Sequence, residues 1–156
     1  MISIDFKLVQ RDYGTLQLHM DKAVKMSSSV FPVAILTFTV NGVNMGNYHG
    51  SSQETPILAF GTGLIYILNC IQPDGDHLLW HEDGAGGDLQ FQRNGTDTIT
   101  LSDYYDNEVT CDFAELRNAA ECFGKVLLAY FEDNFPVYVR AHPYLKERLT
   151  AVNTLG

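Results

Sequence analysis

The chain has 156 residues, 46% of them hydrophobic, and a formal net charge of −9. This length and composition suit one compact domain with a substantial core and exclude a disordered tail. Because a chain this acidic repels nucleic acid and anionic lipid, we expect neither direct nucleic-acid binding nor membrane binding. Its charged partners are expected to be basic.

Neither the first residues nor the apolar stretches predict secretion or a membrane span. Residues 1–10 lack a basic segment followed by an apolar run, so we expect no secretory signal. The longest apolar stretch, residues 56–71, is interrupted by two glycines and a threonine, which disfavours a transmembrane helix. The three cysteines, Cys70, Cys111 and Cys122, are far apart, which is typical of reduced thiols packed in the core of a cytoplasmic protein.

The N-terminal part of the chain is predicted to be strands. Apolar and polar residues alternate over residues 2–8, the pattern of a half-buried strand. Residues 13–14 predict a turn and residues 16–18 a returning strand. Residues 33–40, VAILTFTV, have the composition of a central strand, and Asn-Gly at 41–42 predicts a tight hairpin after it.

Residues 55–69 are compatible with two structures. Thr55 could cap a helix with Pro56 at its first position, and the apolar residues of 57–68 would then share one face. The two glycines of this segment would each weaken a helix by up to about 1 kcal/mol. The β-branched and aromatic run LIYIL suits a buried strand instead. We favour a buried helix and leave the strand open.

Short strands and turns alternate over the next forty or so residues. A turn at residues 73–76 precedes four strands, which are separated by Gly, Asn and Asp-rich turns at residues 83–87, 94–95 and 103–107. Leu89 and Phe91, and then Ile99 and Leu101, occupy alternate positions and are expected to point inward. The segment is therefore predicted to be an antiparallel meander.

The clearest helix is predicted to begin after Asp112. This aspartate can cap the helix, and Glu115 three residues later completes an approximate capping box. Apolar residues then recur at helical spacing as far as Phe131, and Glu121 and Lys125 form a favourable i,i+4 pair on the other face. We expect this helix to end near residue 134.

The C-terminal residues complete the predicted architecture. Residues 137–140, VYVR, are interpreted as a short extended piece, and Pro143 is expected to open a final helix that carries Leu145, Leu149 and Val152. The order of elements predicts an α+β fold over residues 1–156. We expect one domain, with a mostly antiparallel sheet or meander packed against two to three helices.

The negative charge is concentrated in one part of the chain. Residues 70–115 hold eleven acids and one base, Arg93, which gives a net charge of −10. The rest of the chain holds eight acids and nine bases, a net charge of +1. All of the net negative charge therefore belongs to residues 70–115, which we call the acidic block.

Metal binding and catalysis have little support in the sequence. On a strand, His77 and His81 would lie about 13 Å apart and could not share an ion, so we interpret the histidine face of this strand as exposed. The acidic turns at 74–76 and 103–108 lack the spacing of a helix–loop–helix calcium site. We expect no catalytic residue, no metal ligand and no cofactor.

Two adjacent tyrosines within the acidic block point instead to a partner-binding surface. Tyr104 and Tyr105 stand among Asp103, Asp106 and Glu108. A tyrosine ring supplies contact area and a hydroxyl, and carboxylates attract Lys and Arg. For either tyrosine alone, we favour a role as an anchor that holds a turn on the core. The candidate partner-binding residues are Asp83, Asp88, Asp103, Tyr104, Tyr105, Asp106 and Glu108.

The layout of residues 55–132 resembles that of small cytoplasmic immunity proteins of bacterial polymorphic-toxin systems, including contact-dependent inhibition systems. The shared features are an apolar helix, an acidic meander and a long helix with a D-F-x-x-L type start, here Asp112, Phe113 and Leu116. The resemblance implies an antitoxin without enzymatic activity that binds a cognate toxin domain. Nuclease toxins are commonly basic because they bind phosphates, so an acidic inhibitor would be steered towards them.

Two other functions remain open at this point. One is an enzyme or small-ligand protein with a pocket near His77, His81 and Cys111. The other is a non-catalytic adaptor subunit of a larger assembly that uses the same acidic face. The sequence leaves the oligomeric state undecided.

Overall fold

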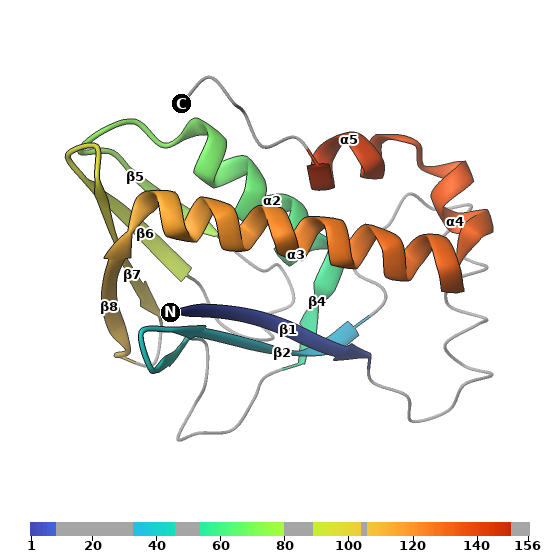
Figure 1. The fold of residues 1–156 in the computed structure, drawn as a ribbon, viewed down its shortest axis with the longest axis horizontal. Coiled ribbons are helices and arrows are strands. Elements are labelled where there is room, and N and C mark those ends of the chain that lie inside the picture. The colour runs from blue at the N-terminus through green and yellow to red at the C-terminus, as the bar shows by residue number, and fades with distance from the viewer. Residues whose placement is uncertain (9–32, 46–53, 80–88, 104–105, 151–156) are drawn as a thin grey trace.

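The computed structural model describes residues 1–8, 33–45, 54–79, 89–103 and 106–150. In this part of the chain it contains two four-stranded antiparallel sheets and four helices. The predicted α+β class is confirmed, with one helix more than the two or three expected. Figure 1 shows the two sheets at different sides of the helices, with the β5–β8 sheet at the left and the β1–β2 pair below α3.

The first sheet is built around β2 (Val33–Val40). β1 (Ile2–Leu8) pairs with one edge of β2 over its full length, and β3 (Val43–Met45) and β4 (Glu54–Pro56) pair with the other edge. The predicted alternation in β1 is confirmed, since its apolar residues are buried or half-buried and its polar ones exposed. The predicted returning strand at residues 16–18 lies outside the described residues.

The hairpin between β2 and β3 is the one that its sequence predicts. Asn41 and Gly42 have φ angles of 49° and 85°. Two successive positive φ angles are the geometry of a type I′ turn, whose twist matches that of the flanking strands. The hairpin tip reaches the second sheet, where Asn41 Nδ2 donates to the Thr110 carbonyl oxygen at 3.2 Å.

Residues 57–70 form a helix, α2 (Ile57–Cys70), which decides the question that the sequence left open. Thr55 is not the cap, because Thr55 and Pro56 complete β4 and the helix begins one residue later than predicted. The glycines allow close packing. A Cβ at Gly61 would lie 2.9 Å from Leu127 Cδ2, and one at Gly63 would lie 2.6 Å from Leu79 Cδ1.

The second sheet is a meander of β5 (Asp76–Leu79), β6 (Leu89–Asn94), β7 (Thr98–Asp103) and β8 (Glu108–Asp112), paired in chain order. Its inner face carries the residues predicted to point inward: Leu89, Phe91, Ile99 and Leu101 are all buried.

The orientation expected for β5 is partly wrong. We interpreted the face of His77 and Leu79 as exposed, yet Leu79 is buried, His77 is half-buried, and Leu78 is 54% exposed. The reason is the register: His77 and Leu79 lie opposite the buried residues Phe91 and Leu89, and paired residues share a face of the sheet.

Helix α3 (Phe113–Asn134) begins and ends as predicted. The Asp112 carboxylate accepts a hydrogen bond from the Ala114 backbone N–H at 3.3 Å, which confirms the cap, and Lys125 Nζ lies 3.1 Å from Glu121 Oε1. Glu115 lies in the first helical turn, where its carboxylate pairs with the amino group of Met1 at 3.3 Å.

Two short helices follow α3, and the first corrects a prediction. Residues 137–140 are not extended but belong to α4 (Pro136–Ala141), with Pro136 at the first helical position, where its fixed φ suits a helix. Tyr138 is the buried residue of this helix. The predicted final helix is confirmed as α5 (Tyr144–Thr150), which buries Leu145 and Leu149, while Val152 lies outside the described residues.

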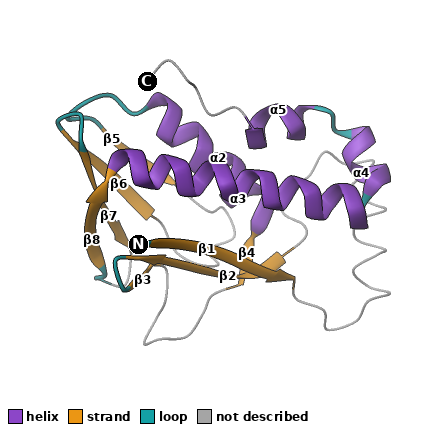
Figure 2. Ribbon diagram, viewed as in Figure 1, coloured by secondary structure: helices purple, strands orange, loops and turns teal. Residues whose placement is uncertain are grey.

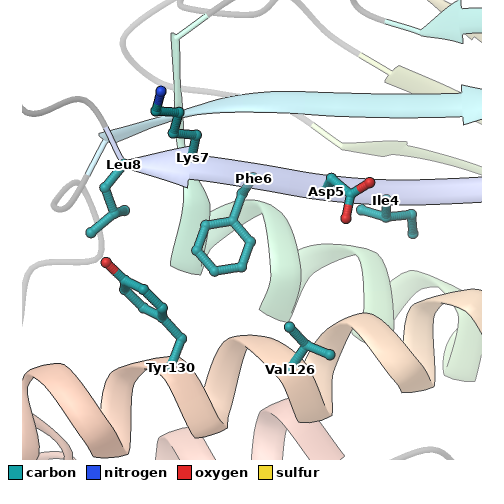
Figure 3. Close-up of a pocket in the computed structure, with 7 residues that line it drawn as sticks. All are labelled: Ile4, Asp5, Phe6, Lys7, Leu8, Val126 and Tyr130. Atoms are coloured by element: carbon teal, nitrogen blue, oxygen red, sulfur yellow. The ribbon is translucent and has the colours of Figure 1, made fainter.

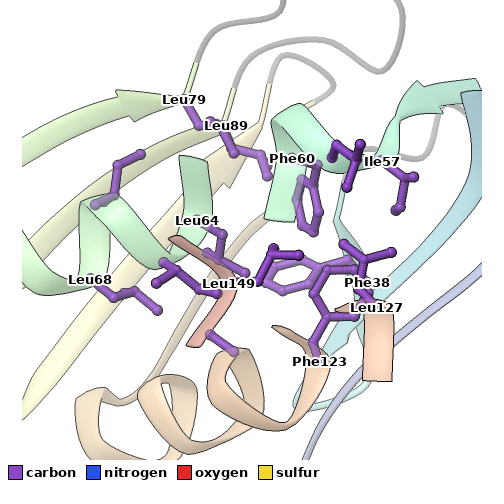
Figure 4. Packing of buried hydrophobic residues seen from close by; sticks show 14 of the residues in the cluster. Phe38, Ile57, Phe60, Leu64, Leu68, Leu79, Leu89, Phe123, Leu127 and Leu149 are labelled. Carbon is purple, nitrogen blue, oxygen red and sulfur yellow. The ribbon is translucent and has the colours of Figure 1, made fainter. Parts of the chain in front are cut away.

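A common core joins the helices to both sheets. In Figure 4, Leu64 and Leu68 of α2 lie near Leu149 of α5, with Leu79 and Leu89 of the second sheet above them. Edge-to-face ring contacts continue from Phe38 to Phe60, Phe123 and Phe6, which link β2, α2, α3 and β1. Figure 2 shows the helices gathered on one side of β1 and β2. α3 contacts β1 of one sheet and β7 and β8 of the other.

The cysteines do not all lie in the core as expected. Cys111 is buried, but Cys70 is half-buried and Cys122 is exposed, because Cys122 lies on the solvent face of α3. Of the helices that the structure describes, none is both long and apolar enough to cross a membrane.

Candidate functional site

The second sheet turns one face away from the helices, and we call it the outer face. The register sets Asp76 opposite Gln92, Gln92 opposite Thr100, and Thr100 opposite Thr110. A neighbouring row runs from Leu78 to Glu108. The outer face comprises Asp76, Leu78, Gln90, Gln92, Asn94, Thr98, Thr100, Ser102, Glu108, Thr110 and Asp112.

Polar side chains on the outer face are connected across the strands. Asn94 Nδ2 donates to Thr100 Oγ1 at 2.9 Å, and Thr100 Oγ1 and Thr110 Oγ1 share a hydrogen bond of 2.7 Å. Cross-strand pairs of this kind stabilise a sheet and hold its side chains in fixed positions. The outer face is thus a preorganised polar surface with one large apolar side chain, Leu78, which is 54% exposed.

The outer face carries three acids and no base. Asp76, Glu108 and Asp112 are exposed, and among the described residues no lysine or arginine forms an ion pair with any of them. The acidic block's one base, Arg93, lies opposite the buried Ile99 and therefore points to the inner face. The negative charge of the outer face is uncompensated by any neighbouring side chain of the described strands.

Arg93 is held inside by several contacts. Its Nη1 donates to the Ile71 carbonyl oxygen at 3.0 Å, and its Nη2 donates to the Thr96 carbonyl oxygen at 3.1 Å. Its guanidinium carbon lies 4.0 Å from the centroid of the Phe113 ring, a favourable cation–π arrangement. Arg93 therefore ties the sheet to the start of α3 and does not reach the carboxylates outside.

Three of the predicted partner-binding residues, Asp103, Asp106 and Glu108, are described at the junction of β7 and β8. The Asp103 carboxylate accepts hydrogen bonds from the backbone N–H and from Nδ2 of Asn107, both at 2.9 Å. Asp103 therefore helps to form the turn, a role that the prediction of a charge contact did not include. Asp106, with φ 63°, and Glu108 are both exposed and available to a partner.

Four predicted partner-binding residues, Asp83, Asp88, Tyr104 and Tyr105, lie outside the described residues. β5 ends at Leu79, β6 begins at Leu89 and β7 ends at Asp103. Leu79 pairs with Leu89, and Leu89 pairs with Asp103, so these three strand termini lie at the same end of the sheet. The described acids Asp106 and Glu108 lie in the same turn region.

Three members of this surface were missed by reasoning from the sequence. Asp76 was considered only as part of a turn, Asp112 only as a helix cap, and Leu78 was not assigned to the solvent. The available signal was the regular alternation of Gln90, Gln92, Thr98, Thr100 and Ser102 with buried residues, which predicts a polar face. The register was needed to add the acids of β5 and β8 to that face.

The structure brings no metal site together in the part of the chain that it describes, where no three His, Cys, Asp or Glu side chains form a suitable group. In the turn at 74–76, Asp74 Oδ1 accepts a hydrogen bond from the Gly95 N–H at 2.8 Å. This carboxylate joins two adjacent turns, which is an ordinary structural role for aspartate.

A pocket that combines His77 and Cys111 is not supported by the geometry. β5 and β8 are the two edge strands of the sheet, so these residues lie roughly 14 Å apart at about 4.8 Å per strand. Burial, with the nearby carboxylates of Glu115 and Asp112, raises the pKa of the Cys111 thiol to about 11. A protonated thiol is a poor nucleophile at neutral pH. His81 lies outside the described residues.

Comparisons of the chain with protein-family models, with curated proteins and with solved structures found no match.

Proposed function

We propose that this protein is an immunity protein, an antitoxin without catalytic activity that binds a cognate toxin domain through the outer face and the adjoining 106–108 turn. The observation that carries the proposal is the segregation of charge on the second sheet. Three of the four acids in its strands, Asp76, Glu108 and Asp112, lie exposed on the outer face, whereas its one base, Arg93, is turned inward and bonded.

Electrostatics favours a basic partner. Exposed carboxylates without nearby cations leave a negative potential that speeds association with a basic surface and repels acidic ones. A nuclease toxin has such a basic surface where it binds the phosphates of its substrate. An inhibitor that covers this groove would block the substrate directly, and it would act in the cytoplasm of the cell that it protects.

The shape of the outer face also suits a protein partner. It is a sheet surface with an ordered hydroxyl and amide network, so little side-chain entropy is lost on binding. Leu78 supplies an exposed apolar contact beside the polar residues Asp76 and Gln90. A stable complex of this type buries on the order of 1,600 Å² in total.

The test removes charge from the outer face and from the 106–108 turn without removing the hydrogen bonds that Asp103 and Asp112 make. Asp103 is left intact because its carboxylate bonds Asn107, and Asp112 is left intact because it caps α3. The variant carries Asp76→Asn, Asp106→Asn and Glu108→Gln, and Asn at position 106 tolerates the positive φ. Protection is measured as growth on co-expression with a candidate basic nuclease toxin domain, and association rates with that domain are measured at 50 and 300 mM NaCl.

A matched control removes three exposed acids from the other end of the molecule, with Glu132→Gln, Asp133→Asn and Glu147→Gln. Both variants change the net charge equally, so only the position of the charge differs. We expect the outer-face variant to associate at least tenfold more slowly at low salt and to protect poorly, and the control to behave like the parent. Equal protection by both variants would show that the outer face is not the binding surface.

A further inference from the structure

A second surface lies between β1 and α3, on the side of the molecule formed by the first sheet. A groove of about 650 Å³ runs along residues 4–8 of β1 and is closed by Val126 and Tyr130 of α3. Figure 3 shows Phe6 pointing from β1 towards α3, with Tyr130 and Val126 rising from the helix to meet it. The floor of the groove is apolar, and Val126 is 60% exposed.

The groove follows an unpaired strand edge in the described part of the chain. There, β1 pairs with β2 only, so its other edge presents backbone N–H and C=O groups without strand partners. Such an edge is a template for another strand. β1 lacks two usual protections, since it contains no proline and spans seven residues.

We propose that the occupant of this edge is a second copy of the chain, with the two β1 strands paired antiparallel about a twofold axis at Phe6. In this register Phe6 lies opposite Phe6 of the second copy, and Ile4 lies opposite Leu8. Asp5 of each copy lies opposite Lys7 of the other copy, so two cross-strand ion pairs form on the solvent face. β1 is therefore complementary to itself in charge and in apolar pattern.

Neighbouring registers are unfavourable. A shift of one residue sets solvent-facing side chains opposite groove-facing ones, because successive residues point to opposite faces. A shift of two residues in one direction sets Asp5 opposite Asp5, and in the other direction Lys7 opposite Lys7. Like charges directly opposite destabilise a strand pair, so one register is selected.

The charge of the groove permits two copies to approach. Its lining carries one acid, Asp5, and one base, Lys7, and thus no net charge, although the whole chain carries −9. The acidic block supplies none of the lining residues. The proposed dimer edge and the proposed toxin surface therefore use different residues on different sheets.

Charge reversals give a direct test. Asp5→Lys alone sets Lys opposite Lys7, and Lys7→Asp alone sets Asp opposite Asp5, so each full-length variant should dimerise at least roughly tenfold more weakly. An equimolar mixture of the two variants restores both opposite-charge pairs, but only between unlike chains. The parent, each variant and the mixture are compared by sedimentation equilibrium from 1 to 200 µM at low salt.

A second pair of variants tests the apolar wall. Val126→Asp places a charge in the groove and should weaken the dimer, whereas Val137→Asp changes an equally exposed valine (56%) of α4 and should not. Circular dichroism confirms that each variant is folded. The proposal is supported if the parent forms dimers, if each charge reversal alone abolishes them, and if the mixture of the two variants restores them.

Each alternative occupant gives a result that overturns the proposal. A parent that stays monomeric at 200 µM excludes the second copy. NOEs between β1 and the predicted returning strand at residues 16–18 would assign the edge to the chain itself. A dimer that is insensitive to Asp5→Lys and Lys7→Asp would use another surface.

Discussion

The two sheets of this protein pack against the same helices, but their exposed surfaces differ in charge. The outer face of β5–β8 carries three acids that form no ion pair with any described lysine or arginine, and it carries an ordered polar network. The β1 edge carries a balanced pair, Asp5 and Lys7, beside an apolar groove. A net charge of −9 therefore describes neither surface. The difference teaches that a charged surface and a strand edge without net charge can be placed on separate sheets around one small core.

The largest expected loss of stability comes from disturbing the packing of α5 on α3, because α3 contacts both sheets. A Cβ at Gly124 of α3 would collide with the Leu149 carbonyl oxygen and lie 2.8 Å from Ile65 Cδ1. We expect Gly124→Ala to lower the free energy of unfolding by about 3 kcal/mol, because backbone atoms cannot move aside cheaply. Urea denaturation followed by circular dichroism measures this change.

The matched control is Asn118→Ala, at an exposed position of the same helix. Here alanine gains helix propensity without a clash, so stability should stay the same or rise slightly. If Gly124→Ala were as stable as this control, α5 would not pack on α3 as closely as the structure has it.

The next effect concerns the second sheet alone. Arg93→Met keeps an aliphatic stem but loses two hydrogen bonds to carbonyl oxygens and the contact with the Phe113 ring. We expect a loss of about 2 kcal/mol in thermal or urea unfolding. Gln90→Ala, at an exposed position of the same strand, should change stability by less than about 0.5 kcal/mol. A similar small loss for both would mean that Arg93 is not a structural link.

The third prediction also concerns the second sheet: alkaline pH should lower stability through Cys111 on the inner face of β8. Burial raises the pKa of this thiol from 9.0 to about 11 in the folded protein. Since the folded state holds the proton more tightly, its stabilising contribution is present below pH 9 and is lost as pH rises towards 11. We expect a loss on the order of 2 kcal/mol over this interval.

The measurement is urea unfolding of the parent, Cys111→Ala and Cys122→Ala between pH 8 and 11. Cys111→Ala should show a flatter pH dependence than the parent, whereas Cys122→Ala, at an exposed position, should keep the parent's slope. A slope shared by all three proteins would assign the alkaline loss to other groups.

The smallest effect tests charge balance on α3. The pair Glu121–Lys125 has an N–O distance of 3.1 Å and both side chains are at least one-third exposed. We expect Lys125→Met to lower stability by about 0.3–0.5 kcal/mol at low ionic strength. The difference from the parent should shrink in 0.5 M NaCl, because salt screens exposed pairs. An unchanged difference in salt would point to lost packing of the lysine stem.

The sequence predicted most elements because local patterns agree with the final environment. The alternation of β6 and β7, the Asn41-Gly42 turn and the Asp112 cap follow from backbone geometry and hydrogen bonding within a few residues. The acidic character of residues 70–115 is likewise a property of composition. These features required no knowledge of distant contacts.

Other features depended on contacts between distant segments. Residues 57–70 form a helix despite the two glycines, and the missing Cβ atoms of Gly61 and Gly63 let Leu127 and Leu79 pack closely against it. Residues 137–140 became helical around the buried Tyr138, and β5 turned Leu79 inward because it pairs with Leu89. The sequence by itself determined that the protein has an acidic meander and a long capped helix. Only the tertiary structure decided which way each acid and Arg93 point, because the register of paired strands fixes the face on which a side chain lies.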